Sequence, residues 1–284
     1  MKVSVIVPAF NSKNRIEKCL KSLLRQDFSD FEIIVVDDGS TDSTAATAKK
    51  LNVKVFSKLN QGPAIARNFG AQKAGGKILV FIDDDCIAEK NWLSEMIKPF
   101  EEEKVAGVQG AYKTMQKELC ARFVQLEIED RYDRLKKAKN LDWIGSYSAA
   151  YRKDVFFEMN GFDESFPMAS GEDPELSFKV SKAGHKIVFN PNAVVFHSHD
   201  TSFAKYFKKK FFRAFWRVCL YKKHSDKIIS DSYTPYSLKA KIPLSLLGVV
   251  FVLIYFFSFF FQLPVGPQII LKIALGMVLL NFLL

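Results

Sequence analysis

The sequence predicts an α/β protein whose parallel sheet is followed by a membrane-associated tail. Over the first 110 residues, short apolar runs alternate with amphipathic helical patterns. Apolar strands in this arrangement are typical of a parallel sheet that helices cover on both faces. Two long apolar segments after residue 241 predict the tail. With 284 residues, the chain is long enough for one domain of roughly 200 residues and appendages.

Hydrophobic periodicity places the elements of the first half. Strands are predicted over 3–7, 31–36, 53–56 and 77–82, and helices over 14–24, 64–74 and shortly after Asp42. In a parallel sheet, ligands bind beyond the carboxyl ends of the strands. Segments 8–10, 37–38 and 83–85 follow three of these strands, so we expect them to line one crevice.

The second half has a less regular pattern. We predict helices over 118–137, 174–183 and 203–221, and strands over 143–151, 186–190 and 194–197. These elements and the charge distribution divide the chain into a domain of residues 1–200, a basic aromatic segment of residues 201–241 and a membrane hairpin of residues 242–284.

Three adjacent carboxylates, Asp83, Asp84 and Asp85, end the strand over 77–82. Like charges at a strand end repel one another and are costly to desolvate unless a cation neutralises them. Oxygen-only ligands indicate Mg²⁺ or Mn²⁺. In an extended segment, alternation puts Asp83 and Asp85 on one side and Asp84 on the other. The alternative is a solvated acidic turn that caps a helix near Asn91.

The positive charge is concentrated behind the predicted domain. The whole chain carries a net charge of +10, and residues 201–241 contain eleven Lys or Arg against Asp226 and Asp231. With Lys272 counted, residues 1–200 are neutral. A nucleic-acid-binding fold would carry its charge on the folded face, so we expect no nucleic-acid partner.

The tail reads as a membrane hairpin. The uncharged stretch over 242–263 is long enough to cross the ~30 Å hydrocarbon core of a bilayer as a helix. A Pro-Val-Gly-Pro turn follows, and then a second apolar segment over 268–284. Basic residues beside a span stay on the cytoplasmic side, which places residues 1–241 there. Met1 leads straight into a strand without a signal peptide, and the four cysteines lack pairing or metal-ligand spacing, as in reduced cytosolic proteins.

Six motifs carry a family resemblance. They are Val3-Ser-Val-Ile-Val-Pro-Ala-Phe-Asn11, Val35-Val-Asp-Asp-Gly-Ser-Thr-Asp42, Gly62-Pro-Ala-Ile-Ala-Arg-Asn68, Asp83-Asp-Asp85, Gly161-Phe-Asp-Glu164 and Gly171-Glu-Asp-Pro-Glu-Leu176. The first four resemble the donor half of the family 2 glycosyltransferases, and the last two are similar to its acceptor half. The resemblance covers about residues 2–200. It implies a glycosyltransferase A fold (Rossmann-like), a nucleotide-sugar donor, a divalent metal and inversion at the anomeric carbon.

The resemblance also implies the metal ligands. Asp85 matches the family's ligand, and Asp83 or Asp84 would be the second carboxylate, the other facing the ribose or sugar. Family members often supply a third ligand from a histidine after the last strand, which here is His197 or His199, with His197 preferred. Two His separated by one residue face the same way in an extended segment, so either could serve. Mn²⁺ or Mg²⁺ bridging the phosphate oxygens would help the nucleoside diphosphate to leave.

Further donor contacts are implied nearby. Asp38 aligns with the family residue that hydrogen-bonds the base, and Pro8 and Phe10 would form the wall beside it. The alternative for these three is an ordinary strand-end turn. Arg67 would lie near the diphosphate or support the acidic cluster, or it is a surface helix arginine that does neither.

The second half supplies the expected catalytic and acceptor residues. An inverting displacement needs a carboxylate opposite the leaving group to take the acceptor hydroxyl's proton. Asp173 resembles the family's base, and Glu172 would support it or bind the acceptor. Asp173 also suits a helix N-cap before a proline. Trp143, Gly145 and Tyr147 would shape the acceptor pocket, although Trp143 is equally suited to the core.

The resulting prediction is a membrane-anchored inverting glycosyltransferase that moves a sugar from a UDP- or GDP-sugar to a lipid-linked or cell-envelope glycan. A polyprenyl-phosphate sugar synthase is the alternative. The Gln-x-x-Arg-Trp motif of processive polysaccharide synthases is missing, which argues against a polymer synthase. No Gly-x-Gly-x-x-Gly follows the first strand, which argues against a Rossmann dehydrogenase.

A membrane lipid partner is predicted by the basic aromatic helix. Phe203, Phe207, Phe211 and Phe215 recur every four residues among lysines and arginines. Such a helix can lie in the headgroup region of a bilayer, with its rings buried and its cations beside lipid phosphates. The alternative is that the aromatic rings pack on the domain and the cations form a solvated face.

Overall fold

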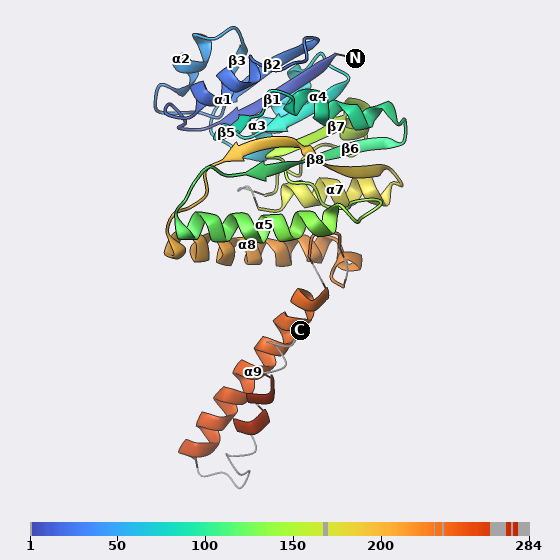
Figure 1. Ribbon diagram of the computed structural model, residues 1–284. Coiled ribbons are helices and arrows are strands. Elements are labelled where there is room, and N and C mark those ends of the chain that lie inside the picture. Colours follow the sequence, from blue (N-terminus) through green and yellow to red (C-terminus); the bar gives the residue numbers. More distant parts are fainter. Residues whose placement is uncertain are drawn as a thin grey trace. The chain divides into compact units, whose positions relative to one another are not determined.

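The computed structural model describes residues 2–166, 170–229, 231–234, 236–261, 271–273 and 275–277 (Figure 1). The chain forms two compact units, Met1–Ser225 and Asp226–Leu284. The basic aromatic helix, α8 (Phe203–Lys223), belongs to the first unit. The division between the two units therefore falls within the segment 201–241, after Ser225.

The first unit is built on one mixed sheet with strand order β3-β2-β1-β4-β7-β6-β8-β5. Its strands are β1 (Val3–Ala9), β2 (Phe31–Asp37), β3 (Lys54–Ser57), β4 (Ile78–Ile82), β5 (Cys86–Ala88), β6 (Val105–Lys113), β7 (Ser148–Arg152) and β8 (Lys186–His197). The first four pair in parallel, as the sequence predicts, and their carboxyl ends meet at one edge. β4 then pairs with β7 antiparallel, which starts the mixed half.

Helices cover both faces of this sheet, in line with the prediction. Val5 and Val7 of β1 pack toward α1 (Ile16–Leu23), α2 (Thr44–Lys49) and α4 (Trp92–Ile97), whereas Ile6 packs toward the opposite face. That second face is covered by α3 (Pro63–Lys73), α5 (Leu119–Leu135), α6 (Lys153–Glu158) and α7 (Glu172–Lys182). In Figure 1, α5 and α8 lie side by side at the edge of this layer.

The mixed half departs from the sequence prediction. β5 and β6 were not expected, β7 begins at Ser148 rather than Trp143, and β8 is one long strand rather than two. Glycines interrupt the apolar pattern of β6, and at Gly110 a Cβ would lie only 2.1 Å from the Ser148 hydroxyl oxygen. Pro191 makes the middle of β8 read as a turn, but the strand continues past a register shift opposite Gln109 and Ala111.

The second unit contains a long apolar helix, α9 (Tyr236–Phe260). Its segment Lys239–Ser258 has a mean hydropathy of 2.2 and is long and apolar enough to cross a membrane. Only 6% of this segment is buried. The helix corresponds to the first predicted span, and the second, over 268–284, lies largely outside the described residues.

Candidate active site

The acidic triplet forms a turn, so its three side chains diverge. β4 ends at Ile82, and the backbone N–H of Cys86 donates to the carbonyl of Asp83 over 3.1 Å. The expectation that Asp83 and Asp85 share one side is therefore wrong, because it assumed that the strand stays extended. Each carboxylate instead faces a different element.

Asp83 binds an arginine that also reaches the second half of the chain. Arg67 of α3 donates from Nη2 to Asp83 Oδ1 over 2.9 Å and from Nη1 to Glu172 Oε1 over 3.0 Å. The Arg67 side chain is 3% exposed and that of Glu172 is fully buried. Burial opposes the charge of Arg67, but Asp83, Asp173 and Glu172 raise the pKa of its guanidinium above the ordinary value. Of the three expectations for Arg67, its contacts match support of the acidic cluster.

Asp84 turns toward the loop after β1. It is hydrogen-bonded to the Ser12 hydroxyl, and Arg15 Nη2 lies 3.4 Å from its Oδ1. The backbone N–H of Phe10 also points at it. Burial raises the pKa of Asp84 to about 6. Asp84 thereby ties the first donor motif to the acidic turn.

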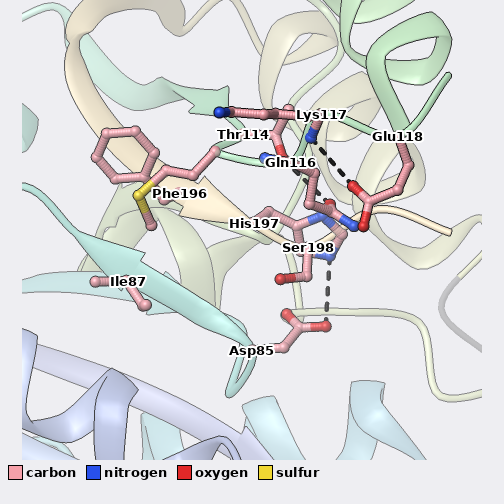
Figure 2. Close-up of a pocket in the computed structure, with 10 residues that line it drawn as sticks. Asp85, Ile87, Thr114, Gln116, Lys117, Glu118, Phe196, His197 and Ser198 are labelled. Carbon is pink, nitrogen blue, oxygen red and sulfur yellow. Dashed lines mark hydrogen bonds and ion pairs between the residues drawn. The ribbon is translucent and has the colours of Figure 1, made fainter. Parts of the chain in front are cut away.

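Asp85 faces His197, with 3.4 Å between Oδ2 and Nε2 (Figure 2). Burial alone would raise the pKa of Asp85, but the hydrogen bond and charge of His197 lower it. The His197 ring stacks on Tyr112, which stacks in turn on Tyr147. His199 lies beside His197, with 3.1 Å between their Nδ1 atoms, and its Nε2 is 2.9 Å from Gln125 Oε1. Burial lowers the pKa of His199 to about 4. His197 is therefore the histidine placed beside the acidic turn.

The side chains fit a divalent cation that is shared with a ligand. Within the described ranges, no group of three His, Cys, Asp or Glu side chains is arranged to hold a metal. Asp85 and His197 form a two-donor set, and Asp83 is already held by Arg67. The carboxylate of Asp85 suits either Mg²⁺ or Mn²⁺. Phosphate oxygens and water would complete such a site.

A cavity of about 640 Å³ adjoins this pair. Its walls come from the edge strand β5, the end of β8 and the loop between β6 and α5 (Figure 2). Ile87, Met115 and Phe196 give it apolar surface, and Lys117 gives it a cation. Asp85 and Glu118 add two carboxylates, so the lining combines apolar, positive and negative groups.

The expected base lies in the first turn of α7. The neighbouring Glu172 accepts backbone N–H bonds from Ser170 and Gly171, at 2.8 and 3.0 Å. Ser146 donates hydrogen bonds to Asp173 from its backbone and its side chain. Asp173 Oδ1 has no hydrogen-bond partner among the described residues. Burial, followed by the charge of Glu172, raises the pKa of Asp173 to about 7.

The remaining donor candidates lie at the carboxyl ends of β1 and β2. Asp38 accepts from Lys58 Nζ and from the backbone N–H of Gly62, both over 2.8 Å, so it organises the loop before α3. Its role in base recognition stays a prediction. Phe10 is 45% exposed beside the half-buried Pro8, so its ring is available to a ligand.

The acceptor candidates divide between core and site. Trp143 is buried, its ring lying edge-on to Phe178 with Arg217 above it, which matches the core alternative. The Gly145 N–H donates to Gln109 Oε1. The Tyr147 hydroxyl lies 2.9 Å from that of Tyr132.

Sequence reasoning missed Tyr112, Ser146 and Gln125, which hold the site residues. Tyr112 stands near the carboxyl end of β6, a strand that the apolar pattern did not predict. Recognising β6 would have placed Tyr112 beside the expected crevice. Ser146 and Gln125 carry no local signal, because their partners are distant in sequence.

The fold and site together define a glycosyltransferase A protein, with an acidic turn at the edge of a parallel half-sheet and a carboxylate pair on a helix of the second half. A family model of Glycosyl transferase family 2 matches residues 4–158. This is more than half of the 284 residues, so the chain belongs to that family.

Similar proteins differ widely in length. An uncharacterised glycosyltransferase of Rickettsia conorii is 42% identical over 105 residues, and this chain covers 17% of that protein. Glycosyltransferase AglE of Haloferax volcanii is 26% identical over 223 residues, which are 74% of this chain and 70% of AglE. The dolichyl N-acetyl-alpha-D-glucosaminyl phosphate 3-beta-D-2,3-diacetamido-2,3-dideoxy-beta-D-glucuronosyltransferase of Methanococcus voltae is 26% identical over 73% of this chain and 70% of its own length.

Solved structures share the fold. The mannosyltransferase PcManGT from Pyrobaculum calidifontis, in complex with GDP-Man and Mn²⁺, has a TM-score of 0.59 at 22% identity, covering 71% of this chain and 58% of the other. TarS 1–349 of S. aureus in complex with UDP has a TM-score of 0.57 at 22% identity, covering 98% and 80%.

Proposed function

We propose that this chain is a metal-dependent inverting glycosyltransferase that moves a sugar from a UDP- or GDP-sugar to a lipid-linked or cell-envelope glycan. The observation that carries the proposal is the Arg67 bridge. One buried guanidinium holds Asp83 of the acidic turn and Glu172 beside Asp173. It thereby sets the distance between the side chains expected to face the donor and the expected base.

Asp173 would act as the base. Its Oδ1 is free of protein partners among the described residues, and its raised pKa suits a group that accepts a proton near neutral pH. Ser146 would orient the carboxylate that takes the proton of the acceptor hydroxyl. The Arg67 and backbone contacts of Glu172 would keep this second carboxylate from moving into the acceptor's place.

Asp85 and His197 would hold the cation at the donor diphosphate. When bound, a divalent cation neutralises the charge that develops on the departing diphosphate. The stack of Tyr112 and Tyr147 on His197 would fix the imidazole plane. Pro8, Phe10 and Asp38 would receive the nucleoside, and Asp84 would keep their loop beside the acidic turn.

The comparisons support this substrate class. PcManGT was solved with GDP-Man and Mn²⁺, and TarS with UDP. The name of the Methanococcus voltae relative describes a dolichyl-phosphate-linked acceptor. We also propose membrane attachment through α9, with the first unit on the cytoplasmic side, because of the basic residues that precede it.

A ligand screen on the full chain tests the proposal. UDP- and GDP-sugars are added with Mn²⁺, with Mg²⁺ or with EDTA, and the melting temperature is measured. We expect stabilisation by one nucleotide class that needs the metal. Stabilisation by none of them would contradict the proposal.

Transfer assays then separate the two acceptor classes. The stabilising donor, carrying a radiolabelled sugar, is offered to polyprenyl phosphate and to polyprenyl-diphosphate-linked glycans. Transfer to a linked glycan is expected. Transfer to polyprenyl phosphate alone would identify a polyprenyl-phosphate sugar synthase instead.

A further inference from the structure

The outer surface of α5 and α8 is apolar although the first unit has a well-filled core. Exposed side chains from both helices make up this surface, which we call the α5–α8 face: Leu119, Phe123 and Leu126 of α5, and Phe203, Phe207, Phe211, Phe215 and Val218 of α8. Phe211 is 74% exposed, and Phe207 64%. Exposed aromatic rings in such number mark a binding surface rather than ordinary scatter.

The two helices are firmly packed against each other. The exposure of their apolar side chains is therefore not the result of a detached helix. The Tyr206 hydroxyl donates to Glu127 over 2.9 Å, and Lys210 binds the same carboxylate. Phe123 contacts the rings of Phe203 and Tyr206, and this contact joins the apolar parts of the two helices. α8 thus turns one side to α5 and keeps Phe207 and Phe211 outside.

The charge beside the apolar row indicates what covers it. α8 contains no acidic residue. Lys205, Lys208 and Lys222 are among its cations, and the described residues offer them no ion pair. A second copy that set α8 against α8 would bring these cations against one another, which is unfavourable. An anionic bilayer instead accepts both the rings and the lysines, whose stems extend toward lipid phosphates.

We propose that the α5–α8 face binds the surface of an anionic lipid bilayer. Only residues 224–235 separate α8 from the apolar helix α9 along the chain. The same face begins at Leu119, directly after the loop Met115–Glu118 that lines the cavity beside Asp85. Bilayer binding would therefore set that cavity at the lipid surface.

The test measures lipid contact at single positions in the full chain. A fluorophore is attached at Phe211→Cys in a Cys219→Ser background, since the other three cysteines are buried. Leu59→Cys, at an 84% exposed apolar position after β3, is the matched control. Each protein is mixed with liposomes of phosphatidylcholine, with or without phosphatidylglycerol, that carry nitroxide-labelled lipid.

We expect strong quenching at position 211 with phosphatidylglycerol and little at position 59, and we expect salt to reduce the difference. Equal quenching at both positions would overturn the proposal, as would quenching at 211 that ignores lipid charge and salt. A blue shift at 211 that grows with protein concentration and needs no lipid would identify a second copy as the occupant.

Charge reversal gives an independent test. The triple variant Lys205→Glu, Lys208→Glu, Lys222→Glu should weaken binding of the face by more than about a hundredfold, because each lost cation removes roughly a fivefold gain and each new carboxylate is repelled by the anionic surface. The control reverses three exposed lysines elsewhere: Lys18, Lys90 and Lys98. Equal loss in both triple variants, with unchanged melting temperatures, would show that the position of the cations does not matter and would overturn the proposal.

Discussion

At the scale of single residues, Arg67 connects the two halves of the site. Its two terminal nitrogens bind carboxylates that belong to different motifs, and its Nε has no hydrogen-bond partner among the described residues. A buried ion pair is costly to assemble but more costly to break, since one lost partner leaves an uncompensated charge. The residue therefore has both a structural and a positioning effect.

Replacing Arg67 by Met should destabilise the protein by about 3–5 kcal/mol, the cost of leaving a buried partner unpaired. Arg67→Lys should recover part of this stability, yet one ammonium cannot make the same forked contact to Asp83 and Glu172. Urea unfolding measures the loss, with the exposed Arg25→Met as control. Equal free energies of unfolding for Arg67→Met and the control would show that the bridge does not stabilise the protein.

Asp173→Asn should lower turnover by the ~10²–10⁴-fold of general-base catalysis while leaving donor binding intact. The exposed Asp154→Asn serves as the control. Wild-type turnover at saturating substrate should rise with pH through about 7, since the base works when it is ionised. A variant that keeps more than a tenth of wild-type turnover would exclude Asp173 as the base.

The same residue makes a prediction for stability. Because the folded-state pKa of Asp173 is raised, the folded protein retains its proton longer than the unfolded chain does. Stability should then fall as pH rises from roughly 4, the ordinary Asp value, to about 7. Asp173→Asn should reduce that fall and melt higher than wild type above pH 7. If the melting temperatures of wild type and Asp173→Asn changed equally with pH across this range, the raised pKa of Asp173 would be contradicted.

At the scale of elements, the turn after β4 and the end of β8 decide which side chains meet. Because the chain turns at Asp83, the three adjacent carboxylates face different elements. Asp83 faces α3, Asp84 faces the loop after β1, and Asp85 faces β8. On β8, His197 still belongs to the strand beside β5, whereas His199 has left it and packs against α5. Neighbouring residues of one type thus acquire different contacts.

This difference gives a matched pair of variants. Asp85→Ala and His197→Gln should abolish or strongly weaken Mn²⁺-dependent binding of UDP or GDP, whereas His199→Gln should preserve it. Titration calorimetry with and without the metal measures the effect. Equal metal-dependent affinity in wild type and Asp85→Ala would remove Asp85 from the metal site, and loss with His199→Gln alone would move the ligand to His199.

At the scale of the whole molecule, the chain joins a sheet-based unit to a unit whose long helix is almost entirely unburied. Only 6% of its apolar segment is buried, so packing among the described residues does not account for its composition. A bilayer provides an apolar partner.

A charge in the middle of α9 should therefore weaken membrane retention. Leu253→Arg places a cation at an exposed position of the apolar segment, at a cost of about 2.5–3.5 kcal/mol on insertion scales. The fraction that resists alkaline extraction from membranes is measured, with Leu59→Arg as control. Retention equal to the control would argue that α9 does not enter the bilayer.

The sequence by itself determined the parallel half of the sheet, the helices that cover it, the row of phenylalanines in α8 and the long apolar segment of α9. Each of these depends on local periodicity, since burial of a strand or a helix face follows from spacing along the chain. The family motifs likewise indicated the candidate site residues before any packing was known. β6 was not predicted because its glycines interrupt the apolar pattern. These glycines are required by close contacts with β7 and β8, which the local pattern does not show.

Only the tertiary structure decided how the site is arranged. The direction of each side chain in the acidic triplet depends on where β4 ends and on which neighbouring side chains bind its carboxylate. The bridge from Arg67 to Glu172 joins segments more than a hundred positions apart. Patterns of local spacing do not extend over such a separation, so they could not predict it. Local sequence specifies which side chains are available, whereas long-range packing specifies which of them meet, because contact energy depends on distance in space.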